Sequence, residues 1–248
     1  MKICVAQTKP FKGNIEKNIA THKELIRLAV SNGAEIIFFP ELSITGYEPK
    51  LASELATRAT DERFDEFQEI SDKQNITIAI GVPTKTETGV CISLAIFQPG
   101  KKRETYSKKY LHSSEEPFFL SGVHFTGLLG AHNNIAPAIC YELSVPQHAA
   151  DAANQGAKIY MVSVVEDIEG VERAIKKLSA TAATHSMTVL MANVIGPTGA
   201  YYGGGKSSVW NDKGELKGQL DTSHEGILVY DTSTTHVVEK HLREELVK

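Results

Sequence analysis

Four short runs of nearly uninterrupted apolar residues constrain the fold of this chain more than any other feature. They are 36–39 (IIFF), 76–82 (ITIAIGV), 158–164 (KIYMVSV) and 188–195 (TVLMANVI). Runs of this length are typical of strands buried on both faces, as in a sheet that helices cover. Longer segments with apolar residues at helical spacing separate them, such as 14–31. This alternation predicts an α/β fold.

The other segments follow the same pattern. Further strands are predicted at 2–7, 90–97, 102–107, up to Ile139, and near 207–210, 215–219 and 226–230, with helices near 62–74, 146–155 and 170–185. SNGAEIIFFP (31–40) resembles NQGAKIYMVS (154–163), which suggests two α/β halves stacked through their sheets. Nothing between 130 and 150 resembles a linker, so we expect one domain spanning residues 1–248.

Composition excludes several classes of protein. The formal net charge of -4, with dispersed lysines, gives no basic surface for nucleic acid. The N-terminal apolar run is too short for a signal peptide or a membrane span. Three widely spaced cysteines form no CxxC pair, and the nine histidines show no metal-binding spacing. We therefore expect a reduced, cytoplasmic protein with no nucleic-acid or membrane partner, no cofactor and no metal.

Glu41 directly follows the apolar run 36–39 and Pro40. One interpretation is a carboxylate that faces solvent at a strand end. The other is a general base at the carboxyl end of a strand, where α/β sheets place their ligands. Burial would raise the pKa of this carboxyl toward the range that such a base needs.

Two lysines and a cysteine are further candidates. In YSKKY (106–110), strand alternation puts Lys108 on one face with the tyrosines and Lys109 on the other. Both lysines could instead belong to a solvated edge strand. Cys140 ends an apolar strand before a predicted helix. A lone buried cysteine is usually inert, but at a strand-to-helix turn the thiol is exposed and backbone N–H groups can bind an oxyanion.

Together these segments resemble the nitrilase superfamily of carbon–nitrogen hydrolases over nearly the whole chain. FFPELSITGY (38–47) is similar to the family's glutamate block, and AICYELSVP (138–146) to its cysteine block. Tyr106, Lys108 and Leu111 match its lysine block. ANVIG (192–196), followed by GGGKSSVWNDKGEL (203–216), is similar to its closing region.

The resemblance implies a four-layer α-β-β-α sandwich of two stacked mixed sheets, assembled as a homodimer or larger homo-oligomer. It also implies Glu41 as base, Lys108 as electrostatic stabiliser and Cys140 as nucleophile. The family's second glutamate lies seven residues before a glycine, which gives Glu115 measured from Gly122, although a one-residue loop shift would make it Glu116 instead.

The implied substrate is a small amide, a nitrile or an N-carbamoyl compound, with Tyr141 and Glu142 placed in the oxyanion and substrate pocket. Leu143-Ser144 replace an arginine that is often found in members acting on carboxylate-bearing substrates. Without such a bidentate clamp, and with Glu142 adding negative charge, we expect a neutral or cationic substrate. A distant arginine such as Arg173 could substitute for the missing one.

Two other functional classes compete with the hydrolase. A non-catalytic member would keep the sandwich as a binding or assembly module, but such a module has no need of Glu41, Lys108 and Cys140 together. A thiol redox protein would need a resolving cysteine near Cys140, and the sequence has none nearby.

Overall fold

The fold is built around two β-sheets, in a computed structural model that describes residues 1–58, 60–122, 127–132 and 134–242. Among these residues, the larger sheet has the strand order β14 (Val237–His241), β13 (Gly226–Asp231), β1 (Lys2–Gln7), β2 (Ile36–Phe38), β3 (Thr77–Lys85), β4 (Val90–Phe97) and β5 (Glu104–Ser107). The smaller sheet has the order β12 (Leu216–Gln219), β11 (Ser208–Trp210), β8 (Thr188–Ala192), β7 (Ile159–Ser163) and β6 (Ile135–Ile139). A separate hairpin pairs β9 (Ile195–Thr198) with β10 (Tyr201–Gly204).

Each sheet contains one group of three parallel strands, and its other pairs are antiparallel. β2 lies between β1 and β3, and β7 between β6 and β8, each with parallel neighbours. Parallel pairing needs crossover connections, which are usually helices. These are α1 (Ile15–Ser31), α2 (Ala52–Leu55), α3 (Asp65–Gln74), α4 (Pro146–Asn154) and α5 (Ile168–His185), with short 3₁₀ turns η1 (Pro49–Leu51), η2 (Glu62–Phe64) and η3 (Cys140–Ser144).

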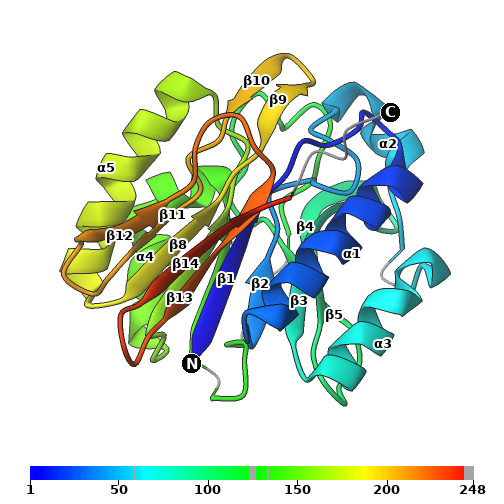
Figure 1. The fold of residues 1–248 in the computed structure, drawn as a ribbon. Helices are drawn as coiled ribbons and strands as arrows, with labels where there is room; N and C mark the ends of the chain where they lie inside the picture. Colours follow the sequence, from blue (N-terminus) through cyan, green and yellow to red (C-terminus); the bar gives the residue numbers. More distant parts are fainter. Residues whose placement is uncertain (59, 123–126, 133, 243–248) are drawn as a thin grey trace.

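Three apolar clusters define four layers. One lies between the sheets and joins Val5 of β1 to Met161 of β7. A second packs Leu25 of α1 against the larger sheet, and a third packs Leu178 of α5 against the smaller one. Figure 1 shows α1 and α3 outside one sheet and α4 and α5 outside the other. The predicted α-β-β-α sandwich is therefore confirmed.

Most predicted elements are present within a few residues. The apolar run 188–195 is instead divided between β8 and β9, because the buried Asn193 side chain donates to the carbonyls of Glu166 and Gly205. β10 and β14 were not predicted. β14 lies at the edge of the sheet beside β13, and burial hardly alternates along it. A strand of this kind needs no alternating apolar pattern, so its sequence gives a weak strand signal.

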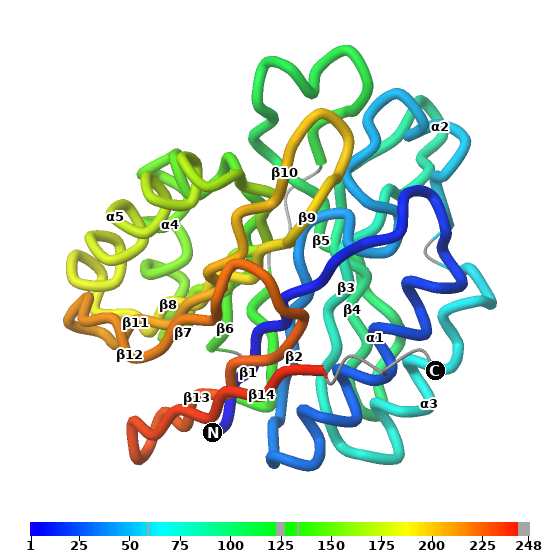
Figure 2. The backbone as a smooth tube through the Cα atoms, turned by 45° about the horizontal axis from the view of Figure 1, so that its top comes forward, coloured from blue at the N-terminus to red at the C-terminus, as the bar shows by residue number. Residues whose placement is uncertain are grey.

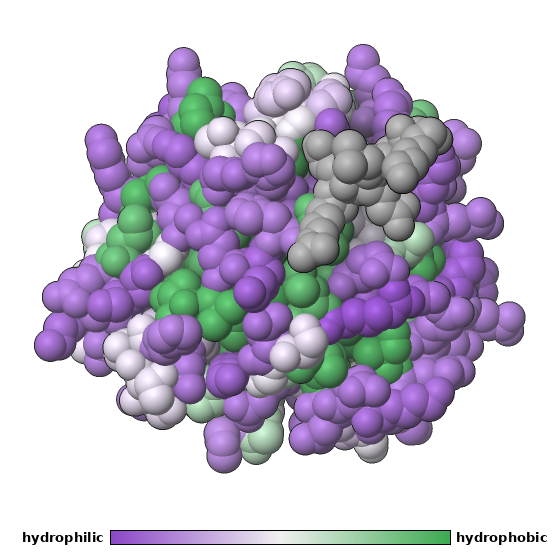
Figure 3. Space-filling model, viewed as in Figure 1, coloured by the Kyte–Doolittle hydropathy of each residue, from purple (hydrophilic) through white to green (hydrophobic). Residues whose placement is uncertain are grey.

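The face of the molecule that carries β13 and β14 is mostly polar (Figure 3). Figure 3 shows the face that carries β13 and β14, where hydrophilic side chains dominate and hydrophobic groups gather in a band across the middle. No helix within the described ranges is long and apolar enough to cross a membrane.

Candidate active site

The candidate residues follow the carboxyl ends of strands at one edge of both sheets. Glu41 follows β2, Lys108 follows β5, and Cys140 follows β6. β5 runs in the direction of β3, since both are antiparallel to β4. This edge is the upper end in Figure 1, and Figure 2 shows the β9–β10 hairpin standing above it. The crevice beyond the carboxyl ends of strands is the usual ligand site of α/β sheets.

The turn that carries Glu41 is held by its backbone. Leu42 adopts φ +50°, and the Ile44 N–H donates to the Gly81 carbonyl at 3.0 Å. A Cβ at Gly81 would lie 2.1 Å from the Pro40 oxygen, so this close approach of two chain segments requires glycine. The Glu41 side chain is 1% exposed, which contradicts the solvent-facing alternative.

Lys108 is fully buried between two carboxylates. Its ammonium donates to Glu41 Oε1 at 2.8 Å and to Glu115 Oε1 at 2.7 Å. Lys109 points to the other side, where its ammonium lies 4.9 Å from the centre of the Tyr110 ring. The two lysine side chains are thus separated as predicted, but Tyr110 lies with Lys109 and not with Lys108, because β5 ends at Ser107 and strict alternation does not continue beyond it.

Glu115 occupies the position that the glycine spacing favoured over Glu116. Its Oε1 accepts from Lys108 Nζ and from the Tyr47 hydroxyl at 3.2 Å, and its Oε2 accepts from the His112 N–H at 2.8 Å. Glu116 is exposed, whereas Glu115 is buried. The hydrogen bonds from Tyr47 and His112 fix the Glu115 carboxylate, which in turn orients the Lys108 ammonium.

Cys140 lies at the predicted strand-to-helix turn. It is the first residue of η3, directly after β6, and has φ +43°. This left-handed backbone is uncommon for a residue other than glycine, and such strain is often found at functional sites. The residue Cys140 is partly exposed. Cys4 and Cys91 are both buried.

Burial and charge together set the protonation states. Burial, reinforced by the negative charge of Glu115, raises the pKa of Glu41 to about 7 although Lys108 opposes this. Burial disfavours the Lys108 ammonium, but the neighbouring carboxylates outweigh it and raise the lysine pKa. Burial and the charge of Glu41 raise the pKa of the Cys140 thiol. The resting site therefore holds a neutral thiol, a charged lysine and a carboxyl group that titrates near neutrality.

One oxygen of the Glu41 carboxylate is available to take up a proton. Oε1 is bound by Lys108, whereas Oε2 is buried and has no hydrogen-bond partner among the described residues. The Cys140 thiol lies close enough to lower the pKa of Glu41. This arrangement can move a proton between sulfur and carboxylate.

The prediction that Glu142 belongs to the substrate pocket is wrong. Glu142 is fully buried, with its carboxylate turned away from the pocket. Oε1 accepts from the Lys109 N–H at 2.7 Å, and Oε2 accepts from the Ile139 N–H at 2.8 Å and the Tyr106 hydroxyl at 2.5 Å. Because the chain turns at η3, this carboxylate joins the cysteine turn to the lysine segment instead of charging the pocket.

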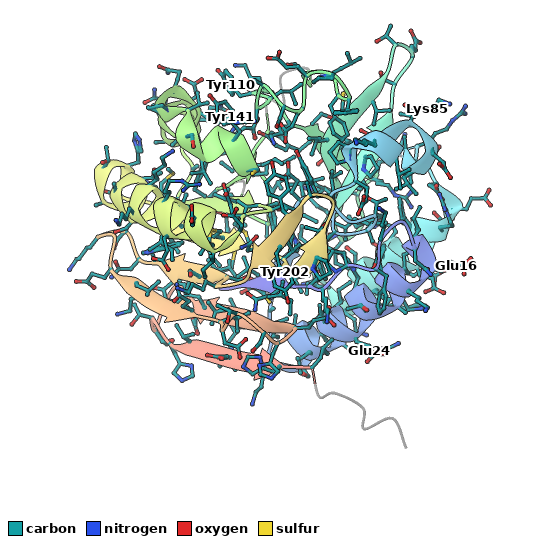
Figure 4. The ribbon with its side chains drawn as sticks, turned by 90° about the horizontal axis from the view of Figure 1, so that it is seen from above. Glu16, Glu24, Lys85, Tyr110, Tyr141 and Tyr202 are labelled. Carbon is teal, nitrogen blue, oxygen red and sulfur yellow. The ribbon has the colours of Figure 1, made fainter. Side chains whose placement is uncertain are left out.

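A pocket of about 310 Å³ opens onto these groups. Tyr141 lines it as predicted, and Figure 4 shows Tyr141 near α4 at the site end of the molecule. Leu143 and Ser144 also line it, but Arg173 and Lys177 of α5 supply the cations missing after the cysteine. The other lining residues are Glu41, Tyr47, His112, Ser114, Glu115, Cys140, Val165, Glu166, Asp167, Gly170, Ala174 and Tyr201.

The sequence interpretation missed the acidic pair Glu166-Asp167 in the pocket wall. Glu166 comes two residues after the apolar run 158–164, much as Glu41 follows its own run. The argument that identified Glu41 would therefore have identified Glu166. Tyr201 gave no comparable signal, because β10 was not predicted.

One group of described side chains could hold a metal ion elsewhere on the molecule. Ligand atoms of Asp221, His224 and His241 lie within 4.8 Å of one another, and all three residues are exposed. None of them lines the pocket.

Several known proteins resemble this chain over part or most of its length. It is 23% identical to the "Hydrolase in agr operon" of Staphylococcus aureus over 96% of this chain and 93% of that protein. It is 33% identical to a glutamine-dependent NAD(+) synthetase of Acinetobacter baylyi, over 44% of this chain but only 20% of that longer protein. An amidase from Nesterenkonia sp. AN1, solved with the acetamide moiety of fluoroacetamide added covalently at its active-site cysteine, has a TM-score of 0.83.

The likeness to that amidase covers 92% of this chain and 89% of the amidase chain at 22% identity, and therefore concerns the fold. The family model for carbon-nitrogen hydrolases matches residues 2–239. The chain belongs to the carbon-nitrogen hydrolase family of the nitrilase superfamily.

Proposed function

We propose that this protein hydrolyses small amides through a thioester on Cys140, with Glu41 as general base and Lys108 as stabiliser of the oxyanion. The observation that carries the proposal is a buried ion-paired group beside the pocket. The Lys108 ammonium binds Glu41 and Glu115, and both of these carboxylates line the pocket together with Cys140. A binding module has no need for a buried lysine between two carboxylates, since burying charges is costly.

Glu41 first takes the thiol proton on its free Oε2 as Cys140 Sγ attacks the amide carbon. The tetrahedral intermediate then collapses as Glu41 returns the proton to the departing nitrogen, which leaves as ammonia. Glu41 next removes a proton from water, whose oxygen attacks the thioester carbon. The acid is released, and the proton returns to sulfur. One base thus serves both half-reactions of a covalent mechanism.

The oxyanion that forms in both halves needs fixed positive charge. The Lys108 ammonium provides it, since the carboxylates beside it keep it protonated. The Tyr141 N–H, in the first turn of η3, is the second proposed donor. Pre-oriented donors of this kind need no rearrangement during the reaction. Glu115 acts through Lys108 as a positioning residue.

The pH dependence of kcat/KM follows from the pKa of Glu41. The base must be deprotonated, and burial places its pKa at about 7. We expect kcat/KM to be constant well above this value and to fall about tenfold per pH unit below it. A pH series with a neutral amide measures this. An acid limb near the ordinary carboxyl pKa, or one near that of the thiol, would contradict the assignment.

Selective alkylation tests the nucleophile. Burial raises the thiol pKa of all three cysteines, but of the three only Cys140 is partly exposed, and it lies beside Glu41, which can take up its proton. We expect iodoacetamide near neutral pH to label Cys140 first, because reactivity follows access and thiolate formation. Peptide mass mapping of the folded protein identifies the site. Earlier labelling of Cys4 or Cys91 would overturn the assignment.

The reaction class is tested by ammonia release from a panel of neutral amides, nitriles and N-carbamoyl compounds. We expect the amides to be hydrolysed fastest; a mutant of the Nesterenkonia amidase has been solved with butyramide. Faster turnover of nitriles or N-carbamoyl compounds would mean that the protein belongs to the family but is not an amidase. No turnover of any of the three classes would favour a binding or assembly module.

We also propose that the protein forms a homodimer or a larger homo-oligomer. The hydrophobic band on the face of β13 and β14 in Figure 3 and the free edge of β14 are compatible with self-association. Light scattering coupled to gel filtration measures the mass directly. A monomer at micromolar concentration would contradict the proposal.

A further inference from the structure

Glu166 is held at the pocket wall by a fixed backbone. It lies between β7 and α5, where its N–H donates to Asn193 Oδ1 at 3.0 Å. Its carbonyl accepts from Asn193 Nδ2 at 3.0 Å and from the Gly204 N–H at 2.9 Å. Asn193 is itself fully buried. The position of Glu166 is therefore set by the core rather than by a free loop.

The Glu166 carboxylate is directed at the nucleophile. Its Oε1 lies 4.0 Å from Cys140 Sγ. Its Oε2 packs over Gly170 at the start of α5, where an added Cβ would lie 1.9 Å from this oxygen. The glycine leaves room for the carboxylate, and the carboxylate borders the space that the substrate must enter.

No cation within the described ranges forms an ion pair with Glu166. Arg173 and Lys177 are close enough to lower its pKa, which burial raises, but neither approaches to ion-pair distance. The Lys177 ammonium donates instead to Ser144 Oγ at 2.8 Å. The long contact from the Cys140 thiol is the one side-chain hydrogen bond to the Glu166 carboxylate among the described residues. A half-buried carboxylate in this position is stabilised by a ligand that brings a positive charge and stronger donors.

We propose that Glu166 binds a protonated amino group on the acyl part of the substrate, which makes short amino amides the preferred substrate class. The inference rests on the proposed amide hydrolysis at Cys140. The carbonyl carbon must come within about 3–3.5 Å of sulfur to react. With Oε1 4.0 Å from that sulfur, an amino group on the α or β carbon can reach the carboxylate. A carboxylate at the same place would meet repulsion.

Three amides with the same four-atom chain and different end groups test the effect of charge at the far end of the acyl group. β-Alaninamide is cationic, butyramide is neutral and succinamate is anionic. We expect kcat/KM for β-alaninamide to exceed that for butyramide by about tenfold to a hundredfold, the range of one hydrogen bond between charged groups. Succinamate should be the slowest of the three.

Two variants near the start of α5 and one control test whether Glu166 causes the preference for the cationic amide. Glu166→Gln should bring the β-alaninamide to butyramide ratio close to one and improve succinamate relative to butyramide. Gly170→Ala keeps the charge but displaces the carboxylate, and should lower the ratio as well. Glu169→Gln removes an equal charge from the same helix turn at an exposed position outside the pocket, and should leave the ratio unchanged.

Binding to a Cys140→Ala protein separates this inference from the hydrolase assignment, because it needs no turnover. Calorimetry should show tighter binding of β-alaninamide than of butyramide, and the added Glu166→Gln change should remove the difference. Equal binding in both proteins would overturn the inference while leaving amide hydrolysis standing. So would an equal loss of rate for all three substrates in Glu166→Gln, since Glu166 would then act on the thiol.

Discussion

Cys140→Ala is expected to lower kcat for amide hydrolysis by about 10⁵–10⁶-fold, as loss of a catalytic nucleophile does in other covalent hydrolases. No other described sulfur lies in the pocket, so nothing can replace the thioester step. The melting temperature should change little, because Cys140 is partly exposed and the substitution removes one non-hydrogen atom. Ammonia release under saturating substrate and thermal unfolding by circular dichroism measure both effects.

Cys91→Ala is the matched control. Cys91 is buried in β4, away from the pocket, so its loss should leave kcat unchanged and cost a small part of the stability. If Cys140→Ala keeps more than a small fraction of the activity, the thioester mechanism is wrong.

Lys108→Met is expected to have the second largest effect. Removing one oxyanion donor typically lowers kcat by about 10²–10³-fold. Breaking a buried ion pair also lowers the free energy of unfolding by about 3–5 kcal/mol, because Glu41 and Glu115 lose their shared partner. The loss of unfolding free energy should be smaller at acidic pH, where the carboxyl groups of Glu41 and Glu115 take up protons. Steady-state kinetics and urea unfolding at two pH values measure the two effects.

Lys109→Met is the control for this change. The Lys109 side chain lies over the Tyr110 ring, and only its backbone N–H binds Glu142. We therefore expect most of the activity and stability to remain. A severe loss in Lys109→Met with a mild one in Lys108→Met would show that the other lysine faces the nucleophile.

The features that the sequence predicts correctly are those that depend on neighbouring residues. Consecutive apolar residues located the inner strands, and a two-residue period separated Lys108 from Lys109. The carboxyl end of a buried strand identified Glu41. Each of these signals is a property of a few neighbouring residues, so tertiary packing had little room to override it.

The features that the sequence did not predict depend on packing between distant segments. The direction of the Glu142 side chain depends on the 3₁₀ turn after β6 and on the amides of the segment after β5. Arg173 reaches the pocket because α5 crosses beside η3. The sequence leaves Arg173 open as a substitute for the arginine missing after Cys140, and the structure places both Arg173 and Lys177 in the pocket wall. Neither contact has a signature in the residues around it.

The mass of the protein during turnover shows directly whether the reaction passes through a thioester on Cys140. Rapid acid quenching of the wild-type protein with a short amide should trap an added mass equal to the acyl group. Peptide mapping should locate that mass on Cys140, and hydroxylamine should remove it as expected for a thioester. Turnover without any acyl adduct, or an adduct on a different residue, would contradict a thioester intermediate on Cys140.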